Sequence, residues 1–385
     1  MKIDPYKHKE MYLAWKDKNQ QNIASVSQKN SAIILQYLND MEKGLNIAQE
    51  SVKGSRSHSR LNSLKNRLIF FSKKFKELHD LDCVIDISEE QLMGFFSGMR
   101  YGEIRRLNGE VFIATADYVK AFKAFWHWYQ KVNRKKGKDI PDITIDLDTS
   151  RDKPDWVYLT EEQVKQLCDN AKFNYKVLMM FLFDTGIRAP TELMNIKVSD
   201  FFNDFKELNI RDEISKTFGR RIKLMLSSEL IKEYIKVFQL NSEDYLFKIS
   251  PSRTNQYLQR LATRVLGEGK SPAGQKYSEL TLYDFRHNAC CYWLPRYKSE
   301  SALKYRFGWK KSDKIHYYSE LLGMKDTISQ EDMLLDITKT EIEQRLEKSE
   351  KEKVIMQERL ANLEKYIKKF DMVADSLHLE IKEDI

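Results

Sequence analysis

The residues best suited to chemistry lie together in one stretch of the C-terminal half. Residues 280–320 read LTLYDFRHNACCYWLPRYKSESALKYRFGWKKSDKIHYYSE, and about half of them are aromatic or cationic. The stretch has no acidic cluster that could hold a metal, and its notable side chains are Arg286, His287, Trp309, Tyr317 and Tyr318. Several fixed cations beside a phenol, without a metal, indicate work on a phosphodiester.

Exchange of a phosphodiester without a metal requires three kinds of group. The nonbridging oxygens need positive charge, which the planar, permanently charged forks of Arg188 and Arg286 supply. A phenol, Tyr317 or Tyr318, can form a covalent ester. The leaving oxygen needs a proton, and Lys216 can give one because nearby cations lower the pKa of an ammonium. Each residue alone is more often a surface or core residue, but the set in this order is specific.

The elements expected around these residues are mainly helices. An apolar helix at 177–183 precedes DTGIRAPTELMNIKVSDF, in which Thr185-Gly186 marks a tight turn and Pro190 suits the first turn of another helix. Arg188 therefore lies at a turn before a helix. A strand pair at 208–226 turns at Gly219 and carries Lys216. Further helices are predicted from a Thr160 cap, at 230–238 and at 253–266.

The N-terminal region has a helical pattern of its own. Apolar residues recur at spacings of three and four from 31 to about 136, and Ser88 with Gln91 forms a capping box. Residues 114–132 carry five aromatic side chains at helical spacing. A core face is the more common explanation of such a stripe, and base stacking is the alternative.

Two basic segments of this region are candidates for phosphate binding. VKGSRSHSRLNSLKNRL sets serines and arginines just ahead of a helix, where hydroxyls, N–H groups and cations suit an anion. A solvated helix cap explains the same segment equally well. The second segment lies at 131–138. The tentative DNA contacts are Lys53, Ser55, Arg56, Arg60, Lys131 and Lys135.

Composition limits the class of protein. The 385 residues predict two domains and an appendage, and 65 Lys+Arg against 57 Asp+Glu give a net charge of +8, which favours nucleic acid only weakly. No long apolar run predicts a membrane span, and the charged N-terminus lacks a secretion signal. The four cysteines have no CxxC spacing, so we expect reduced thiols in the cytoplasm and neither metal nor cofactor.

The last segment alternates steps of four and three. Its register runs from Ile342 through Leu346, Met356, Leu360 and Leu363 to Ala374 and Leu377, with polar Ser349 and Lys353 weakening the first half. This pattern predicts a short coiled coil or a helix docked on a neighbour. One amphipathic helix packed on its own domain is the alternative.

Four boxes of the chain, in order, resemble the tyrosine recombinases, the family of lambda-type integrases, Cre and the Xer proteins. DTGIRAPTELMNIKVSDF resembles the first arginine box, and ISKTFGRRIKL resembles the hairpin with its lysine. LTLYDFRHNACCYW resembles the His-x-x-Arg-His box, and FGWKKSDKIHYYS the nucleophile box. The similarity covers about 158–320, while residues 31–136 resemble the core-binding domain of the family.

The resemblance implies a role for each matching residue. Arg188 and Arg286 would clamp the scissile phosphate, and Lys216 would be the general acid. Trp309 would buttress the phosphate or hydrogen-bond to it through its indole N–H. The family places its nucleophile nine residues after this position, and 318 − 309 = 9 selects Tyr318.

Two positions depart from the family pattern. Tyr283 replaces the first histidine, and a phenol can donate to phosphate but cannot act as a base near neutral pH. Glu192 lies four residues after Arg188 where three are usual. Glu192 and His287 are expected to orient the residues that touch the phosphate.

The sequence therefore predicts a mainly α fold with a small antiparallel hairpin or sheet in the catalytic domain. Its expected parts are an arm at 1–30, a helical core-binding domain at 31–136, a linker at 137–157, a catalytic domain at 158–325 and a coiled-coil-like helix at 337–380. The two domains would close on DNA as a clamp.

The implied function is site-specific DNA recombination, as in an archaeal or mobile-element integrase. It would proceed through a 3′-phosphotyrosine without metal, ATP or another cofactor, on double-stranded DNA, in a tetramer, in a prokaryotic cytoplasm near the nucleoid. A type IB-like topoisomerase or a hairpin-forming resolvase would share the chemistry. A non-catalytic DNA-binding protein on the same fold is the alternative from another class.

Overall fold

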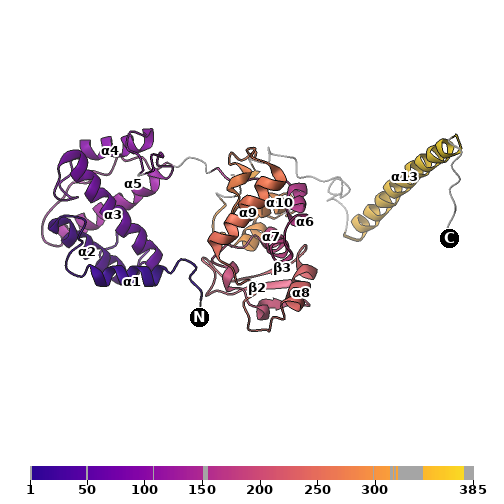
Figure 1. Ribbon diagram of the computed structural model, residues 1–385, viewed down its shortest axis with the longest axis horizontal. Helices are drawn as coiled ribbons and strands as arrows, with labels where there is room; N and C mark the ends of the chain where they lie inside the picture. Colours follow the sequence, from indigo (N-terminus) through magenta and orange to yellow (C-terminus); the bar gives the residue numbers. More distant parts are fainter. Residues whose placement is uncertain are drawn as a thin grey trace. The chain divides into compact units, whose positions relative to one another are not determined.

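The computed structural model describes residues 2–48, 51–106, 108–150, 155–297, 299–312, 315, 318–319 and 341–376 (Figure 1). The chain divides into two units, Met1–His287 and Asn288–Ile385, and each is described by itself. The elements are helices apart from one three-stranded sheet, so the predicted mainly α fold with a small antiparallel sheet is confirmed.

The first unit begins with five helices. Serine side chains cap three of them by accepting the N–H three residues ahead, and the predicted capping box of Ser88 and Gln91 is present. Side-chain capping satisfies N–H groups that a helix start leaves unpaired. The helices are α1 (His8–Lys18), α2 (Gln28–Lys43), α3 (His58–His79), α4 (Glu89–Tyr101) and α5 (Thr115–Arg134).

Aromatic side chains form the centre of this bundle. Phe122 and Phe125 of α5 are fully buried, and Phe122 meets Phe71 of α3 edge to face at 5.4 Å. Trp128 donates its indole N–H to the Asp40 carboxylate at 2.8 Å. The aromatic stripe of residues 114–132 is therefore core, because its rings interlock with α2, α3 and α4.

The predicted N-terminal arm contains a packed helix instead. Tyr12 of α1 is buried in the bundle core, and Asn62 of α3 donates to the His8 carbonyl at 2.8 Å. The Lys65 ammonium lies 4.9 Å from the Trp15 ring. In the sequence, polar residues surround Tyr12 and Trp15. The segment therefore shows little apolar periodicity, although both aromatic side chains pack on the bundle.

Part of the expected linker also packs on the bundle. Trp126 and Gln130 of α5 donate to the carbonyls of Pro141 and Ile140 at 2.9 Å each, and Leu147 belongs to the bundle core. The segment has no helical period, and side-chain donors from α5 hold it in place of regular secondary structure.

The remainder of the first unit carries the sheet and the arginine box. The strands pair antiparallel in the order β1-β2-β3, with Ile210 opposite Arg220. Thr160 caps α6 through a capping box, as predicted. The elements are α6 (Glu161–Asp169), α7 (Phe173–Thr185), β1 (Phe201–Phe202), β2 (Glu207–Ile210), β3 (Arg220–Lys223), α8 (Ser228–Val237) and α9 (Pro251–Leu266), with 3₁₀ turns at Leu193–Asn195, Val198–Asp200 and Tyr277–Glu279. Helix α10 (Asp284–Trp293) begins in this unit and ends in the second.

Two details differ from the sequence prediction. No α-helix begins at Pro190, because the chain turns there and forms only the 3₁₀ turn Leu193–Asn195. The two-residue strand β1 was not predicted, since so short a segment has no measurable alternation.

The second unit contains α11 (Glu300–Phe307) and α13 (Glu341–Ser376). Helix α13 lies within the predicted tail helix at 337–380. Among the described residues, no helix is long and apolar enough to cross a membrane.

Candidate active site

The first arginine of the site follows a sharp helix end. Helix α7 is buried from Val177 to its end, apart from half-buried Met180, and stops at Gly186, whose φ of 59° is left-handed. Gly186 N–H bonds the Leu182 carbonyl at 2.9 Å, and the Thr185 hydroxyl bonds the Phe181 carbonyl at 2.6 Å. Glycine adopts this conformation without steric cost. The Thr-Gly pair thus ends the helix and sets the direction of Arg188.

The carboxylate of Glu192 holds this turn. It accepts the Arg188 backbone N–H at 2.9 Å and the Arg188 guanidinium at 2.7 Å. It also accepts both terminal nitrogens of Arg220, on β3, at 3.3 and 2.9 Å. Glu192 is inaccessible to solvent, and Arg220 is 2% exposed. The one-residue displacement of Glu192 from the family spacing therefore still brings it to Arg188.

Charge decides the protonation state of Glu192. Burial acts to raise the pKa of this carboxyl, but the charges and hydrogen bonds of Arg220 and Arg188 outweigh it and lower the pKa to about 2. Glu192 is therefore ionised at neutral pH, and it neutralises part of the charge of the arginines around it.

Arg286 reaches the same turn from α10. Its side chain is 3% exposed and donates to the Gly186 carbonyl at 2.5 Å. Burial, and then the charge of Arg188, lower its pKa to about 10, with Glu192 opposing. The structure thus brings together three guanidinium groups and the Glu192 carboxylate. Such a set suits an anion with several oxygens.

Asp184 ties the arginine turn to the strands. Its buried carboxylate accepts the backbone N–H groups of Met225, Leu226 and Ser227 at 2.9–3.3 Å, and the Ser227 hydroxyl at 2.8 Å. Asp184 is the last residue but one of α7, whereas the three donors follow β3. Asp184 and Arg220 were not among the site residues predicted from the sequence. The only signal for them was a carboxylate and a guanidinium inside otherwise apolar patterns.

Lys216 lies in the connection between β2 and β3. Its side chain is exposed. Gly219 closes this connection, since a Cβ there would lie 2.9 Å from the Asp212 nitrogen. Gly219 N–H also bonds the Asp212 carboxylate at 2.6 Å. The hairpin that carries Lys216 is therefore attached to the Arg188 turn through Arg220 and Asp184.

Three rings surround the start of α10. His287 stacks on Trp156 with centroids 4.8 Å apart, and Tyr283 meets His287 edge to face at 5.1 Å. Tyr283 is 47% exposed, so its phenol remains accessible. Asp284 accepts the Val157 N–H at 3.1 Å and so fixes the segment that carries Trp156. His287 thus contacts both Trp156 and Tyr283, and the contact with Trp156 was not predicted from the sequence.

The second unit carries Trp309 and Tyr318. Gly308 ends α11 with a φ of 61°, and Trp309 then stacks on Phe307 at 4.9 Å. The Tyr318 ring is nearly parallel to Trp309, at 6.0 Å and 9°, and only 3% exposed. Trp309 thus orients the Tyr318 ring. Tyr317, the other candidate nucleophile, lies outside the described residues.

The tentative DNA contacts of the bundle meet at the loop before α3. Lys131 and Lys135, at the end of α5, donate to the Ile47 carbonyl at 2.7 Å and the Asn46 side chain at 2.6 Å. Lys53 donates to the Ala48 carbonyl at 2.5 Å and Arg56 to the Val52 carbonyl at 2.8 Å.

The serine that caps α3 is Ser57, which bonds the Arg60 N–H, and not Ser55. Ser55 is exposed in the same loop. The structure therefore places five cationic residues around one loop: Lys53, Arg56, Arg60, Lys131 and Lys135. Phosphate binding and solvated capping both fit this arrangement.

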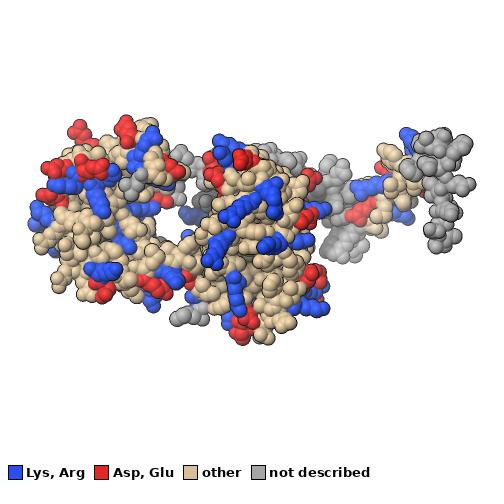
Figure 2. Space-filling model, in the orientation of Figure 1, with Lys and Arg blue, Asp and Glu red and all other residues tan. Residues whose placement is uncertain are grey.

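A further basic face lies on α9. Arg253, Arg260 and Arg264 are exposed there, and Figure 2 shows blue side chains gathered over this helix. Tyr257, on the same helix, stacks on Tyr175 with centroids 3.6 Å apart.

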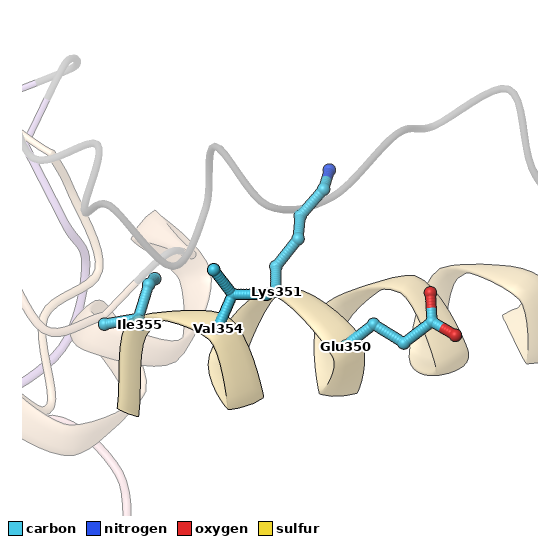
Figure 3. A pocket seen from close by; sticks show the side chains of 4 residues that line it. All are labelled: Glu350, Lys351, Val354 and Ile355. Atoms are coloured by element: carbon cyan, nitrogen blue, oxygen red, sulfur yellow. The ribbon is translucent and has the colours of Figure 1, made fainter. Parts of the chain in front are cut away.

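One cavity has no relation to this chemistry. It measures about 360 Å³ and is lined by Glu350, Lys351, Val354 and Ile355 of α13 (Figure 3). These four residues include no arginine or phenol, so the cavity lacks the groups that the phosphodiester chemistry requires. Within the part of the chain that the structure describes, no group of His, Cys, Asp or Glu could hold a metal ion.

Comparisons with known proteins match the part of the chain that contains these site residues. Residues 157–323 match the phage integrase family. A lambda integrase dimer bound to a COC' core site has a TM-score of 0.54 and 14% identity, over 84% of this chain and 85% of that chain. XerH site-specific recombinase bound to a palindromic difH substrate has a TM-score of 0.52 and 14% identity, over 82% of this chain and 92% of that chain.

The Tn1549 transposon integrase with a circular intermediate DNA has a TM-score of 0.52 and 13% identity, over 75% of this chain and 93% of that chain. No curated protein matches the sequence. At these identities the solved structures establish the fold, while the family match covers the residues that carry the site. Residues 157–323 therefore form a tyrosine recombinase domain of the phage integrase family.

Proposed function

We propose that the chain is a site-specific DNA recombinase that cuts and rejoins strands through a 3′-phosphotyrosine. The observation that carries this proposal is the buried cluster of Arg188, Glu192, Arg220 and Arg286. A cluster with three guanidinium groups and an ionised carboxylate keeps positive charge for a phosphodiester. Fixed charges of this kind stabilise a transition state without reorganisation.

The proposed reaction balances without an outside reactant. Tyr318 Oη passes its proton to water as it attacks the phosphorus, and the bond to the 5′-oxygen breaks while Arg188 and Arg286 stabilise the nonbridging oxygens. Lys216 gives its proton to the leaving oxygen. The products are a 3′-phosphotyrosine and a free 5′-hydroxyl. The 5′-hydroxyl of a partner strand then attacks the ester and releases Tyr318, so the energy of the bond is retained.

The surrounding rings have supporting roles in this proposal. Trp309 orients Tyr318 by stacking and contacts the phosphate through its indole N–H. Tyr283, exposed at the start of α10, donates a hydrogen bond to a phosphate oxygen where the family has histidine. His287 is a positioning residue, because its ring lies between Trp156 and Tyr283.

The partner in this proposal is double-stranded DNA, clamped between the helical domain at 31–136 and the catalytic domain at 158–325. A lambda integrase of similar fold forms a tetramer on a Holliday junction, which supports a tetramer here. The candidate contacts Lys53 and Arg56, with the exposed arginines of α9, would bind phosphates of the DNA. Because the proposed substrate is DNA, we propose that the protein acts in a prokaryotic cytoplasm at the nucleoid.

A nicked suicide substrate tests the nucleophile. Tyr318→Phe should bind DNA but form no covalent adduct, whereas Tyr317→Phe should still form it. Peptide mapping of the adduct identifies the linked residue, and phosphotyrosine at 317 would contradict the assignment.

The alternatives with the same chemistry differ in their products. A recombinase joins strands of two different DNAs, whereas a type IB-like topoisomerase or a hairpin-forming resolvase rejoins within one duplex. Two substrates of different length, one of them labelled, distinguish these outcomes. Cleavage should be unchanged in EDTA, because arginines and no metal supply the positive charge that stabilises the phosphate. Loss of cleavage in EDTA that magnesium restores would favour a nuclease.

A further inference from the structure

Helix α13 presents an apolar face to solvent. Leu346, Met356, Leu360, Leu363 and Ile367 are each 54–67% exposed. At 1.5 Å per residue the 36-residue helix is about 54 Å long. A face of this length is stabilised by packing against a partner more than by helix propensity.

These residues follow a heptad repeat. With Leu360 at position a, Leu346 and Ile367 are also a positions, and Met356 and Leu363 are d positions. A repeat of 3.5 residues keeps one seam facing a second helix, where each side chain packs into a hole on the partner. The spacing therefore fits another helix with the same repeat, and a second copy of α13 has it.

The charges beside the seam select the orientation. In a parallel pair, a residue at g faces the residue five positions later, at e, on the partner. Arg359 is at g and Glu364 is at e, and both are exposed. A parallel pair of identical helices therefore gains Arg359–Glu364 contacts on both sides of the seam.

The antiparallel arrangement gains no such contact. The register that pairs the most apolar residues sets Leu360 against Leu363 of the partner subunit and Met356 against Ile367 of the partner subunit. It then places Arg359 beside Tyr366 of the partner subunit and Gln357 beside Glu364 of the partner subunit. The Arg359–Glu364 contacts therefore favour the parallel pair.

Lys353 gives a further restriction. It occupies the a position one heptad before Leu360 and is exposed. A single lysine at an a position lowers stability, but it fixes the register and the number of strands.

We propose that α13 is the dimerisation element of this protein and pairs with α13 of a second copy as a parallel two-stranded coiled coil. This proposal is independent of the proposed recombination chemistry, since the helix has none of its residues.

Charge reversal in the full-length protein without DNA tests the pairing. Arg359→Glu and Glu364→Arg should each weaken self-association about tenfold in sedimentation equilibrium, because each variant replaces two attractive contacts by repulsive ones. The double variant should restore association to near its original strength. Lys365→Glu changes the same charge at the outward f position and should have no effect.

A disulfide tests the orientation. Leu360→Cys should form a covalent dimer under oxidation, since a positions meet each other only in a parallel pair in register. Asn362→Cys, at an outward position, is the matched control and should not. A monomeric full-length protein would mean that α13 docks on its own body, and absence of the Leu360→Cys dimer would exclude the parallel pair. Either result overturns the proposal. Covalent adduct formation by Tyr318 on a single site is a separate measurement that tests the proposed recombination chemistry.

Discussion

The exposed ammonium of Lys216 contrasts with the buried guanidinium groups near it. Arg188, Arg220 and Arg286 are held by carboxylate or carbonyl partners, whereas Lys216 extends from the hairpin connection to solvent. Fixed charges suit the stabilisation of phosphate oxygens, and a mobile donor suits delivery of a proton to a leaving group.

Lys216→Ala should therefore slow cleavage by about 10²–10⁴-fold, the usual size of general acid help. A substrate with sulfur in place of the 5′-bridging oxygen leaves as a thiolate and needs no proton. This substrate should rescue Lys216→Ala in single-turnover cleavage but leave Arg188→Ala impaired. Equal failure of Lys216→Ala on both substrates would mean that the lysine only contacts DNA.

The pKa of Glu192 predicts how stability depends on pH. Because its folded pKa of about 2 lies below its usual value of 4.5, the ionised group stabilises the fold above about pH 4.5. That stabilisation, roughly 3 kcal/mol at most, is lost as the pH falls from about 4.5 to about 2.

Glu192→Gln should thus lower the urea midpoint at pH 7 and remove this part of the pH dependence. Glu213→Gln is the matched control, since Glu213 pairs with Arg211 but is exposed, and it should change little. If Glu192→Gln keeps the acid-dependent loss of the original protein, another group is responsible.

Among the elements, the position of the hairpin depends on contacts distant in sequence. The Asp184 carboxylate receives four donors from residues 225–227, and Arg220 meets Glu192 across 28 positions. Strand pairing alone would leave the hairpin free to shift against α7. These two buried carboxylates set where Lys216 lies relative to Arg188.

Asp184→Ala should therefore destabilise the domain by about 3 kcal/mol, because several buried donors lose their acceptor. Ser227→Ala, which removes one of the four donors, should cost about 1 kcal/mol. Urea unfolding measures both losses of stability. The difference between them is the contribution of the Asp184 carboxylate beyond its bond to the Ser227 hydroxyl. Equal small effects would show that other groups hold the hairpin.

For the whole molecule, the distribution of charge matters more than the net value of +8. Cationic side chains lie around the loop before α3 and along α9, while acidic residues are interspersed elsewhere (Figure 2). Binding to DNA through phosphates releases counterions, so the affinity depends on salt.

Lys53→Ala combined with Arg56→Ala should weaken DNA binding and reduce the slope of log K against log salt by about 1–2, since each phosphate contact contributes about 0.9. Lys73→Ala, an exposed change farther along α3, is the control and should leave the slope as it is. Fluorescence anisotropy over a range of salt concentrations gives the slopes. An unchanged slope in the double variant would mean that the loop caps α3 and does not bind phosphate.

The sequence by itself determined the features that depend on neighbours along the chain. The helices, the capping boxes at Ser88 and Thr160, the Thr185-Gly186 turn and the strand pair around Lys216 each follow from a local pattern. The order of the four boxes also indicated the family that residues 157–323 match, although Tyr283 and the spacing of Glu192 depart from its pattern.

Only the tertiary structure decided which charges meet. Nothing local to Glu192 indicates that its second partner is Arg220, and nothing local to His287 indicates Trp156. The burial of Tyr12 and the packing of Leu147 were likewise missed. The physical reason is common to these cases: a buried ion pair or a ring stack is specified by the space left between packed elements, and a pattern read along one segment does not contain that space.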